Sequence, residues 1–123
     1  HLLKIQHAEQ LTTDPLKGAI FENMVIADYM KQMHHRSDLS DIWFWRDSSG
    51  NEVDLIVDHG IEKTIVEIKA TKTILSNLLD GLVKYEAISD EKITQKILVY
   101  GGDQVQSRTM ADVVPWSRFR VGK

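Results

Sequence analysis

Residues 52–70, EVDLIVDHGIEKTIVEIKA, hold two apolar runs on either side of a short polar segment that contains Gly60. Apolar runs rich in β-branched residues and separated by a glycine are typical of two strands joined by a tight hairpin turn. Three charged residues interrupt the runs: Asp54, Glu67 and Lys69. Because charged groups inside a sheet need compensating partners, these residues are the first candidates for a functional site.

The turn predicts how the two strands pair. If Gly60 and Ile61 form a two-residue loop, glycine at the first position suits a type II′ turn. Asp54 then falls opposite Glu67, and Glu52 falls opposite Lys69. Like charges directly opposite each other destabilise a sheet, so the two carboxylates require an opposing charge. A divalent cation is one solution, because Mg²⁺ is commonly held by one or two carboxylates together with water and phosphate oxygens.

Alternation of side chains predicts the two faces of this hairpin. On the first strand Glu52 and Asp54 would share one face, and the other face would carry Val53, Leu55 and Val57. On the second strand Glu67 and Lys69 would share a face, and the other would carry Val66, Ile68 and Ala70.

These charges support two interpretations. A lysine beside a bound cation can orient water or stabilise developing charge, which suits metal-assisted phosphodiester hydrolysis. The alternative is a solvated face of an antiparallel sheet, on which acidic side chains meet water. In that case Glu52 and Lys69 would form a surface ion pair worth under about 1 kcal/mol.

The rest of the sequence predicts an α/β fold with a mixed central sheet. A helix is expected from an Asp14 N-cap and Pro15, with an apolar stripe of Leu16, Ala19, Ile20, Met24, Ala27, Met30 and Met33. Strands are expected at 42–47, 52–57, 63–70 and 96–100, with a final edge strand at 113–116 that contains Pro115. A second helix at 76–88 would pack through Leu78, Leu79, Leu82, Val83 and Ile88. The order is α-β-β-β-α-β.

Composition limits the classes of protein. A length of 123 residues suits a single domain, residues 1–123, and the first residue, His1, leads us to expect a fragment of a longer protein. A formal net charge of −3 argues against a strongly basic nucleic-acid-binding protein. The absence of cysteine excludes disulfides and cysteine-ligated zinc, and fits a cytoplasmic protein. No apolar run has membrane-spanning length.

The spacing of the charged residues is similar to a known nuclease signature. Asp54, followed by Glu67-Ile68-Lys69, resembles the D…E-x-K motif of the PD-(D/E)XK nuclease superfamily. That superfamily has a restriction-endonuclease-like α-β-β-β-α-β fold and often carries an acid on its first helix, where this chain has Glu22 in GAIFENMV. Related RecB-like nucleases carry Q-x-x-x-Y on the helix after the third strand. GLVKY keeps Tyr85 but has Gly81 at the glutamine position.

A second resemblance spans almost the whole chain. The blocks LLKIQHAEQLTTDPLKG, GAIFENMVIADYMK, FWRDSSGNEVDLIV, IVEIKATKTI and ILVYGGD…VVPW resemble a C-terminal domain of unknown function. This domain follows the P-loop core in a family of bacterial and archaeal AAA-type ATPases. No G-x-x-x-x-G-K-[ST] motif occurs in these residues, so we expect ATP to bind in the parent ATPase core and not in this segment.

The resemblances imply roles for individual residues. Asp54, Glu67 and the backbone carbonyl of Ile68 would bind Mg²⁺, Lys69 would be the catalytic lysine, and Glu22 would be an auxiliary acid. The implied function is a nuclease-like domain of an AAA-type ATPase that acts on DNA, with the ATPase core of the same chain as a partner. The alternative is a catalytically inactive module that regulates the ATPase, binds DNA or binds a protein. A third hypothesis is an oligomerisation domain.

Other polar and aromatic residues carry weaker signals. Arg46 precedes Asp54 on the predicted hairpin and is the expected phosphate contact. Trp43 and Trp45 could stack on bases, although an alternating aromatic strand more often buries one side and exposes the other. His34 and His35 are neighbours on a helix and do not face each other, so they favour a solvated helix end over a metal site.

Overall fold

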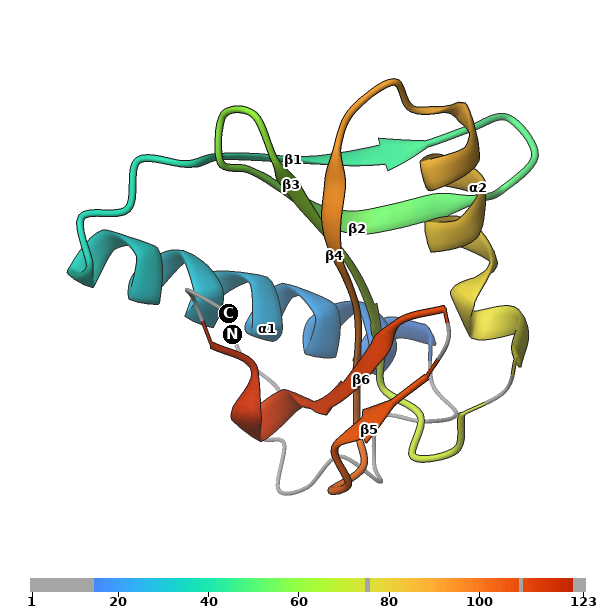
Figure 1. Ribbon diagram of the computed structural model, residues 1–123. Coiled ribbons are helices and arrows are strands. Elements are labelled where there is room, and N and C mark those ends of the chain that lie inside the picture. The colour runs from blue at the N-terminus through green and yellow to red at the C-terminus, as the bar shows by residue number, and fades with distance from the viewer. Residues whose placement is uncertain (1–14, 75, 109, 121–123) are drawn as a thin grey trace.

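The structure of the protein is a computed structural model that describes residues 15–74, 76–108 and 110–120 (Figure 1). Its elements are α1 (Pro15–His35), β1 (Asp41–Arg46), β2 (Glu52–Asp58), β3 (Lys63–Lys69), a 3₁₀ turn (Ser76–Leu79), α2 (Asp80–Ile88), β4 (Ile93–Tyr100), β5 (Gln106–Ser107), β6 (Asp112–Pro115) and a second 3₁₀ turn (Trp116–Arg118). The predicted α/β class and the order of its first six major elements are confirmed. The predicted N-cap Asp14 and the opening block of the family resemblance up to that residue lie outside the described residues.

A mixed six-stranded sheet forms the centre of the fold, with the strand order β1-β2-β3-β4-β6-β5. Strands β1, β2 and β3 form an antiparallel meander. After β3 the chain crosses through α2, so that β4 pairs parallel to β3 and β6 pairs parallel to β4. The two helices lie on opposite sides of this sheet (Figure 1). The described residues include no helix long and apolar enough to cross a membrane.

The first helix packs through a different stripe from the predicted one. Phe21, Val25, Tyr29 and Met33 recur every four residues and are buried against the sheet. Of the predicted stripe, only Met33 is buried, and Leu16, Ala19, Ala27 and Met30 are exposed. The prediction was wrong because it omitted the aromatic rings. Tyr29 stacks on Phe119 with centroids 4.8 Å apart, and burial of two large rings decides which side of α1 faces the core.

The second helix is also packed through an aromatic residue. Leu79, Leu82 and Tyr85 are buried on the far side of the sheet from α1, whereas Val83 and Ile88 are exposed, contrary to the prediction. The Tyr85 ring meets Trp45 of β1 edge to face, with centroids 5.4 Å apart. The polar end of the tyrosine does not prevent burial of its ring, and the sequence-based stripe counted only aliphatic residues.

The strand with Pro115 is not the edge of the sheet. β6 lies between β4 and the short strand β5, which pairs only with Asp112 and Val113. Pro115 pairs with Tyr100 of β4, beyond the end of β5. The proline is therefore accommodated where the neighbouring strand has already ended, since it has no N–H to donate.

The hairpin between β2 and β3 has the predicted register. The pairs run from Leu55 with Val66 to Asp58 with Lys63. The His59 N–H then donates to the Glu62 carbonyl at 2.9 Å, which leaves Gly60 and Ile61 as the turn. Gly60 has a φ of +108°, a left-handed conformation that glycine adopts without strain.

Alternation along β2 fails at one point. Trp43 pairs with Ile56, but Trp45 pairs with Val53, so two residues of β2, Asp54 and Leu55, oppose one of β1, Phe44. This bulge separates the faces differently from the prediction: Val53 packs on the α2 side, whereas Leu55 and Val57 pack on the α1 side. An extra residue reverses the alternation of all residues beyond it, and Asp54 lies in the bulge.

Candidate functional site

Where β2 and β3 separate, the Asp54 side chain accepts a backbone hydrogen bond that would otherwise go to a neighbouring strand. The regular pairing between these strands stops at Leu55 and Val66. One residue further, the Ile68 N–H donates to Asp54 Oδ2 at 2.7 Å. The side chain is only 7% exposed. The bulge and this hydrogen bond therefore hold a carboxylate at the junction of the two strands.

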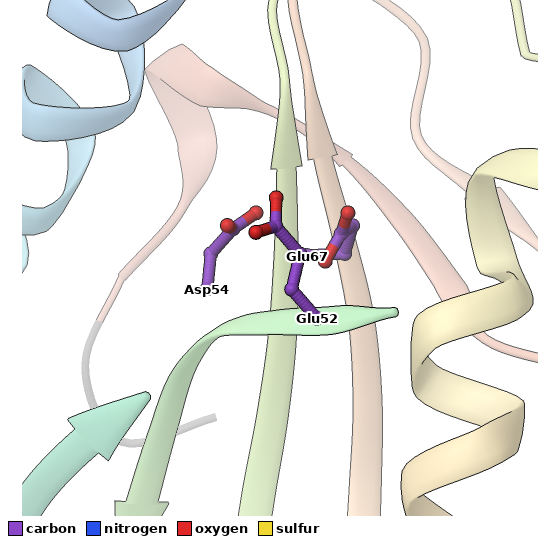
Figure 2. Close-up of side chains that lie close together, drawn as sticks. All are labelled: Glu52, Asp54 and Glu67. Carbon is purple, nitrogen blue, oxygen red and sulfur yellow. The ribbon is translucent and has the colours of Figure 1, made fainter. Parts of the chain in front are cut away.

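Three carboxylates converge at this junction. Glu52 and Asp54 of β2 and Glu67 of β3 each offer an oxygen, and these oxygens lie within 4.8 Å of one another (Figure 2). Among the residues that the structure describes, this is the single group of three acidic, histidine or cysteine side chains with the spacing of a cation site. Carboxylate oxygens at such spacing are the ligands that a hard divalent cation prefers.

Of the three carboxylates, Glu67 has the least favourable environment for a negative charge. Glu67 is 4% exposed, and its Oε2 forms an ion pair with Lys69 Nζ at 3.1 Å. Its Oε1 is buried and has no hydrogen-bond partner among the described residues. Burial and the negative charge of Asp54 raise the pKa of Glu67 to about 8, and Lys69 offsets only part of this effect. A buried carboxylate oxygen without a partner fits a ligand for a cation.

Glu22 extends the acidic group from the opposite side. It is half-buried on α1, and burial together with the charge of Asp54 raises its pKa to about 7. In its protonated form Glu22 donates a hydrogen bond to the Asp54 carboxylate. Burial also raises the pKa of Asp54. The hydrogen bonds from the Ile68 N–H and from Glu22 stabilise the charged form and lower this pKa, but they offset only part of the effect of burial. Asp54 lies in the bulge of β2, and its side chain meets Glu22 of α1 there.

Lys69 and Arg46 supply the positive charge at the site. Although burial opposes it, the adjacent Glu67 raises the pKa of Lys69, which keeps the ammonium charged. Arg46 lies at the exposed rim, where its Nε is 3.1 Å from Glu52 Oε1. The predicted pairing of Glu52 with Lys69 is therefore wrong. Lys69 pairs with Glu67 on its own strand face, and Arg46 is the cross-strand neighbour of Glu52.

The structure thus brings together Glu22, Asp54, Glu67 and Lys69, the four residues singled out for catalysis. It places the Ile68 N–H on Asp54, and the role of the Ile68 carbonyl as a ligand stays a prediction. Glu52 was not predicted to belong to the acidic group, because its place opposite Lys69 favoured an ion pair. The available signal was its place two residues before Asp54. His34 and His35 are exposed at the end of α1, away from the acids.

A cavity of about 250 Å³ adjoins the acids between α1, β1 and β2. It is lined by Glu22, Asn23, Ile26, Phe44, Trp45, Arg46, Glu52, Val53 and Asp54. A small ligand in this cavity would meet carboxylates, an arginine and aromatic rings.

Comparison with known proteins identifies the family but not the activity. A family model described as a domain of unknown function, DUF4143, matches residues 17–119. This match covers most of the chain, so the protein belongs to the DUF4143 family. No curated protein matches the sequence. All the acidic residues of the site lie inside the matched range.

Proposed function

We propose that this protein is a nuclease-like domain that hydrolyses phosphodiester bonds in DNA with the help of Mg²⁺. One observation carries the proposal: Glu52, Asp54 and Glu67 each offer a carboxylate oxygen within 4.8 Å of the others, and the buried Glu67 Oε1 has no hydrogen-bond partner among the described residues, with Lys69 paired to the other oxygen of Glu67. Removing so much negative charge from water is unfavourable without an opposing charge. A bound cation would provide that charge.

The residues divide the chemical work between them. Asp54, Glu67 and Glu52 would hold the cation, and the Ile68 carbonyl is a further candidate ligand. Mg²⁺, when bound, makes water more acidic and neutralises charge on phosphate oxygens. Glu22 has a pKa of about 7, so it can accept a proton from an attacking water near neutral pH. Lys69 stays protonated and can stabilise charge that develops on the phosphate.

The fold supports the same proposal by analogy. The order α-β-β-β-α-β and the D…E-x-K residues at the junction of β2 and β3 resemble the PD-(D/E)XK superfamily. We propose, from the same resemblance, that the domain belongs to the C-terminal part of an AAA-type ATPase whose ATPase core is its partner in the chain. Fold similarity alone does not imply function, so the chemistry of the site carries the argument.

Asp54→Asn tests the proposal. The amide retains an acceptor for the Ile68 N–H but removes the charge, so the fold is preserved while cation binding is lost. Mg²⁺ binding is measured by calorimetry, and cleavage of end-labelled DNA is measured with Mg²⁺ and with EDTA. We expect wild type to bind and cleave, and Asp54→Asn to cleave at least about 100-fold more slowly, as loss of electrostatic stabilisation implies.

Asp90→Asn, an exposed substitution away from the acids, is the matched control and should behave as wild type. Unchanged Mg²⁺ binding in Asp54→Asn, or cleavage that survives EDTA, would contradict the proposal.

A non-catalytic module is the second candidate, and one observation favours it. Gly81 stands where related nucleases carry glutamine, and a Cβ at this position would collide with the backbone carbonyl of Glu52. No glutamine side chain can therefore enter the site from this position. DNA binding by wild type without cleavage, retained in Asp54→Asn, would identify such a module.

A further inference from the structure

The cavity beside the acids has an unusual lining for a cation site. Glu22, Glu52 and Asp54 line one part of it, and Phe44 and Arg46 of β1 line another. The cavity therefore continues from the carboxylates to an aromatic ring and a guanidinium group. Its volume is about 250 Å³, and exposed residues of β1 line part of it, so a ligand longer than the cavity can extend across the outer surface of β1.

Phe44 differs from its aromatic neighbours in the direction it faces. The Trp43 ring centroid lies 5.2 Å from Lys63 Nζ, and Trp45 packs on Tyr85 of α2 while it also lines part of the cavity. Phe44 is 64% exposed and lines the cavity. The guanidinium carbon of Arg46 lies over the Phe44 ring, 5.6 Å from its centroid, so the charge is next to one face of the ring and a base would stack on the other face.

These two side chains match the two parts of a nucleotide. A flat base stacks on an aromatic ring, and the phosphate is drawn to a guanidinium group. Arg46 is held at the rim by Glu52, one of the three converging acids, so a phosphate on Arg46 would lie next to the cation site. A base inside a duplex is already stacked on both faces and cannot reach the ring.

We propose that Phe44 and Arg46 form a subsite for an unpaired nucleotide, so that the substrate is single-stranded DNA or an unpaired end. The base stacks on Phe44, and its phosphate lies between Arg46 and the acids. Among the described residues β1 is an edge strand of the sheet, and Phe44 on it is exposed. The choice of DNA rests on the proposed function, whereas the unpaired base rests on the geometry of Phe44.

Phe44→Ala is the central test. Binding of a fluorescein-labelled single strand, and of the same strand annealed to its complement, is measured by anisotropy. In this binding assay Ca²⁺ is used in place of Mg²⁺, because Ca²⁺ also prefers oxygen ligands. We expect wild type to bind the single strand more tightly than the duplex. Phe44→Ala should weaken single-strand binding about 5-fold to 150-fold, the range seen for loss of one base–aromatic stack, and change duplex binding by less than about twofold.

Three further variants separate stacking from charge and from non-specific effects. Phe44→Tyr keeps the ring and should bind the single strand as wild type does. Arg46→Ala should weaken the binding of both single-stranded and duplex DNA and lower the salt dependence of binding, because it removes a phosphate contact. Ile61→Ala removes another exposed apolar side chain, in the turn between β2 and β3, and should change neither affinity.

The outcomes distinguish this inference from the proposed function. Wild type that cleaves DNA but prefers duplex, or whose single-strand affinity survives Phe44→Ala, overturns the subsite and leaves the nuclease proposal standing. Single-strand binding that depends on Phe44, without cleavage of any DNA, supports the subsite and contradicts the nuclease proposal. Wild type that binds neither form of DNA overturns the subsite.

Discussion

At the scale of single residues, the site holds more negative charge than its surroundings compensate. Glu22, Asp54 and Glu67 all have raised pKa values, and for each of them burial is the largest cause. Lys69 is in direct contact with Glu67 and supplies positive charge there. A protein gains no stability from such an arrangement, because each ionisation in a buried group of like charges is unfavourable. The arrangement is explained if the charge serves a ligand.

Glu67→Gln should make the stability of the metal-free protein less dependent on pH. The pKa of Glu67 rises from 4.5 to about 8 on folding, so the folded state holds a proton that the unfolded state releases between these values. Wild type therefore loses stability as the pH rises from about 5 to 8, and the loss ends above about 8. Glutamine does not titrate, so we expect the free energy of unfolding of Glu67→Gln at pH 8 to exceed that of wild type by roughly 1 to 3 kcal/mol.

The measurement is urea unfolding at pH 5 and pH 8 in the presence of EDTA. At pH 5 wild type and Glu67→Gln should have similar free energies of unfolding, because Glu67 is then protonated in the folded state. A variant that is less stable than wild type at pH 8 would show that Glu67 is ionised and well compensated in the folded protein.

At the scale of secondary-structure elements, a bulge and a close helix contact build the site. The bulge in β2 directs Asp54 toward α1, and the approach of α2 at Gly81 supports the backbone of Glu52 from the other side. Two of the three converging carboxylates thus depend on local departures from a regular strand and helix. Bulges are frequent next to active sites for this reason.

Gly81→Ala should destabilise the protein and weaken cation binding together. A Cβ at Gly81 would overlap the Glu52 carbonyl, so α2 or the first residue of β2 must shift. Overpacking of this kind costs about 1 to 3 kcal/mol. The control is Gly18→Ala in α1, where a Cβ meets nothing within 4 Å. This change should raise stability by up to about 1 kcal/mol through helix propensity.

Thermal unfolding and Mg²⁺ calorimetry on both glycine variants check this pair of predictions. Gly81→Ala with wild-type stability and wild-type Mg²⁺ affinity would show that the contact between α2 and Glu52 does not position the site.

The sequence predicted the hairpin because its signals are local. A glycine at the turn and alternating apolar residues determine the register from Leu55 to Lys63 without help from the rest of the fold. The bulge at Asp54 left no such signal, since it arises from the pairing of β2 with β1, and it reversed the predicted faces of Leu55 and Val57. The role of Glu52 was missed for the same reason: its partner, Arg46, depends on the register between β1 and β2.

At the scale of the whole molecule, the sheet combines two kinds of strand. An antiparallel meander, β1 to β3, carries all the acids except Glu22, and the parallel strands β4 and β6 complete a buried core behind it. The acids lie where β2 leaves β3, between the two helices (Figures 1 and 2). The hydrophobic layers on both sides therefore offset the unfavourable charge at the centre of the fold.

Mg²⁺ should consequently stabilise the whole fold, and more strongly at pH 8 than at pH 6. At a concentration 100 times its dissociation constant, a ligand of the folded state adds about 2.7 kcal/mol, which raises the melting temperature by several degrees. At pH 6 the cation must first displace protons from Glu67 and Glu22, whose pKa values are about 8 and about 7. Binding should therefore release protons at pH 6 and almost none above pH 9. Calorimetry in two buffers of different ionisation enthalpy counts these protons. Equal Mg²⁺ affinity at both pH values, without proton release at pH 6, would place the cation away from these acids.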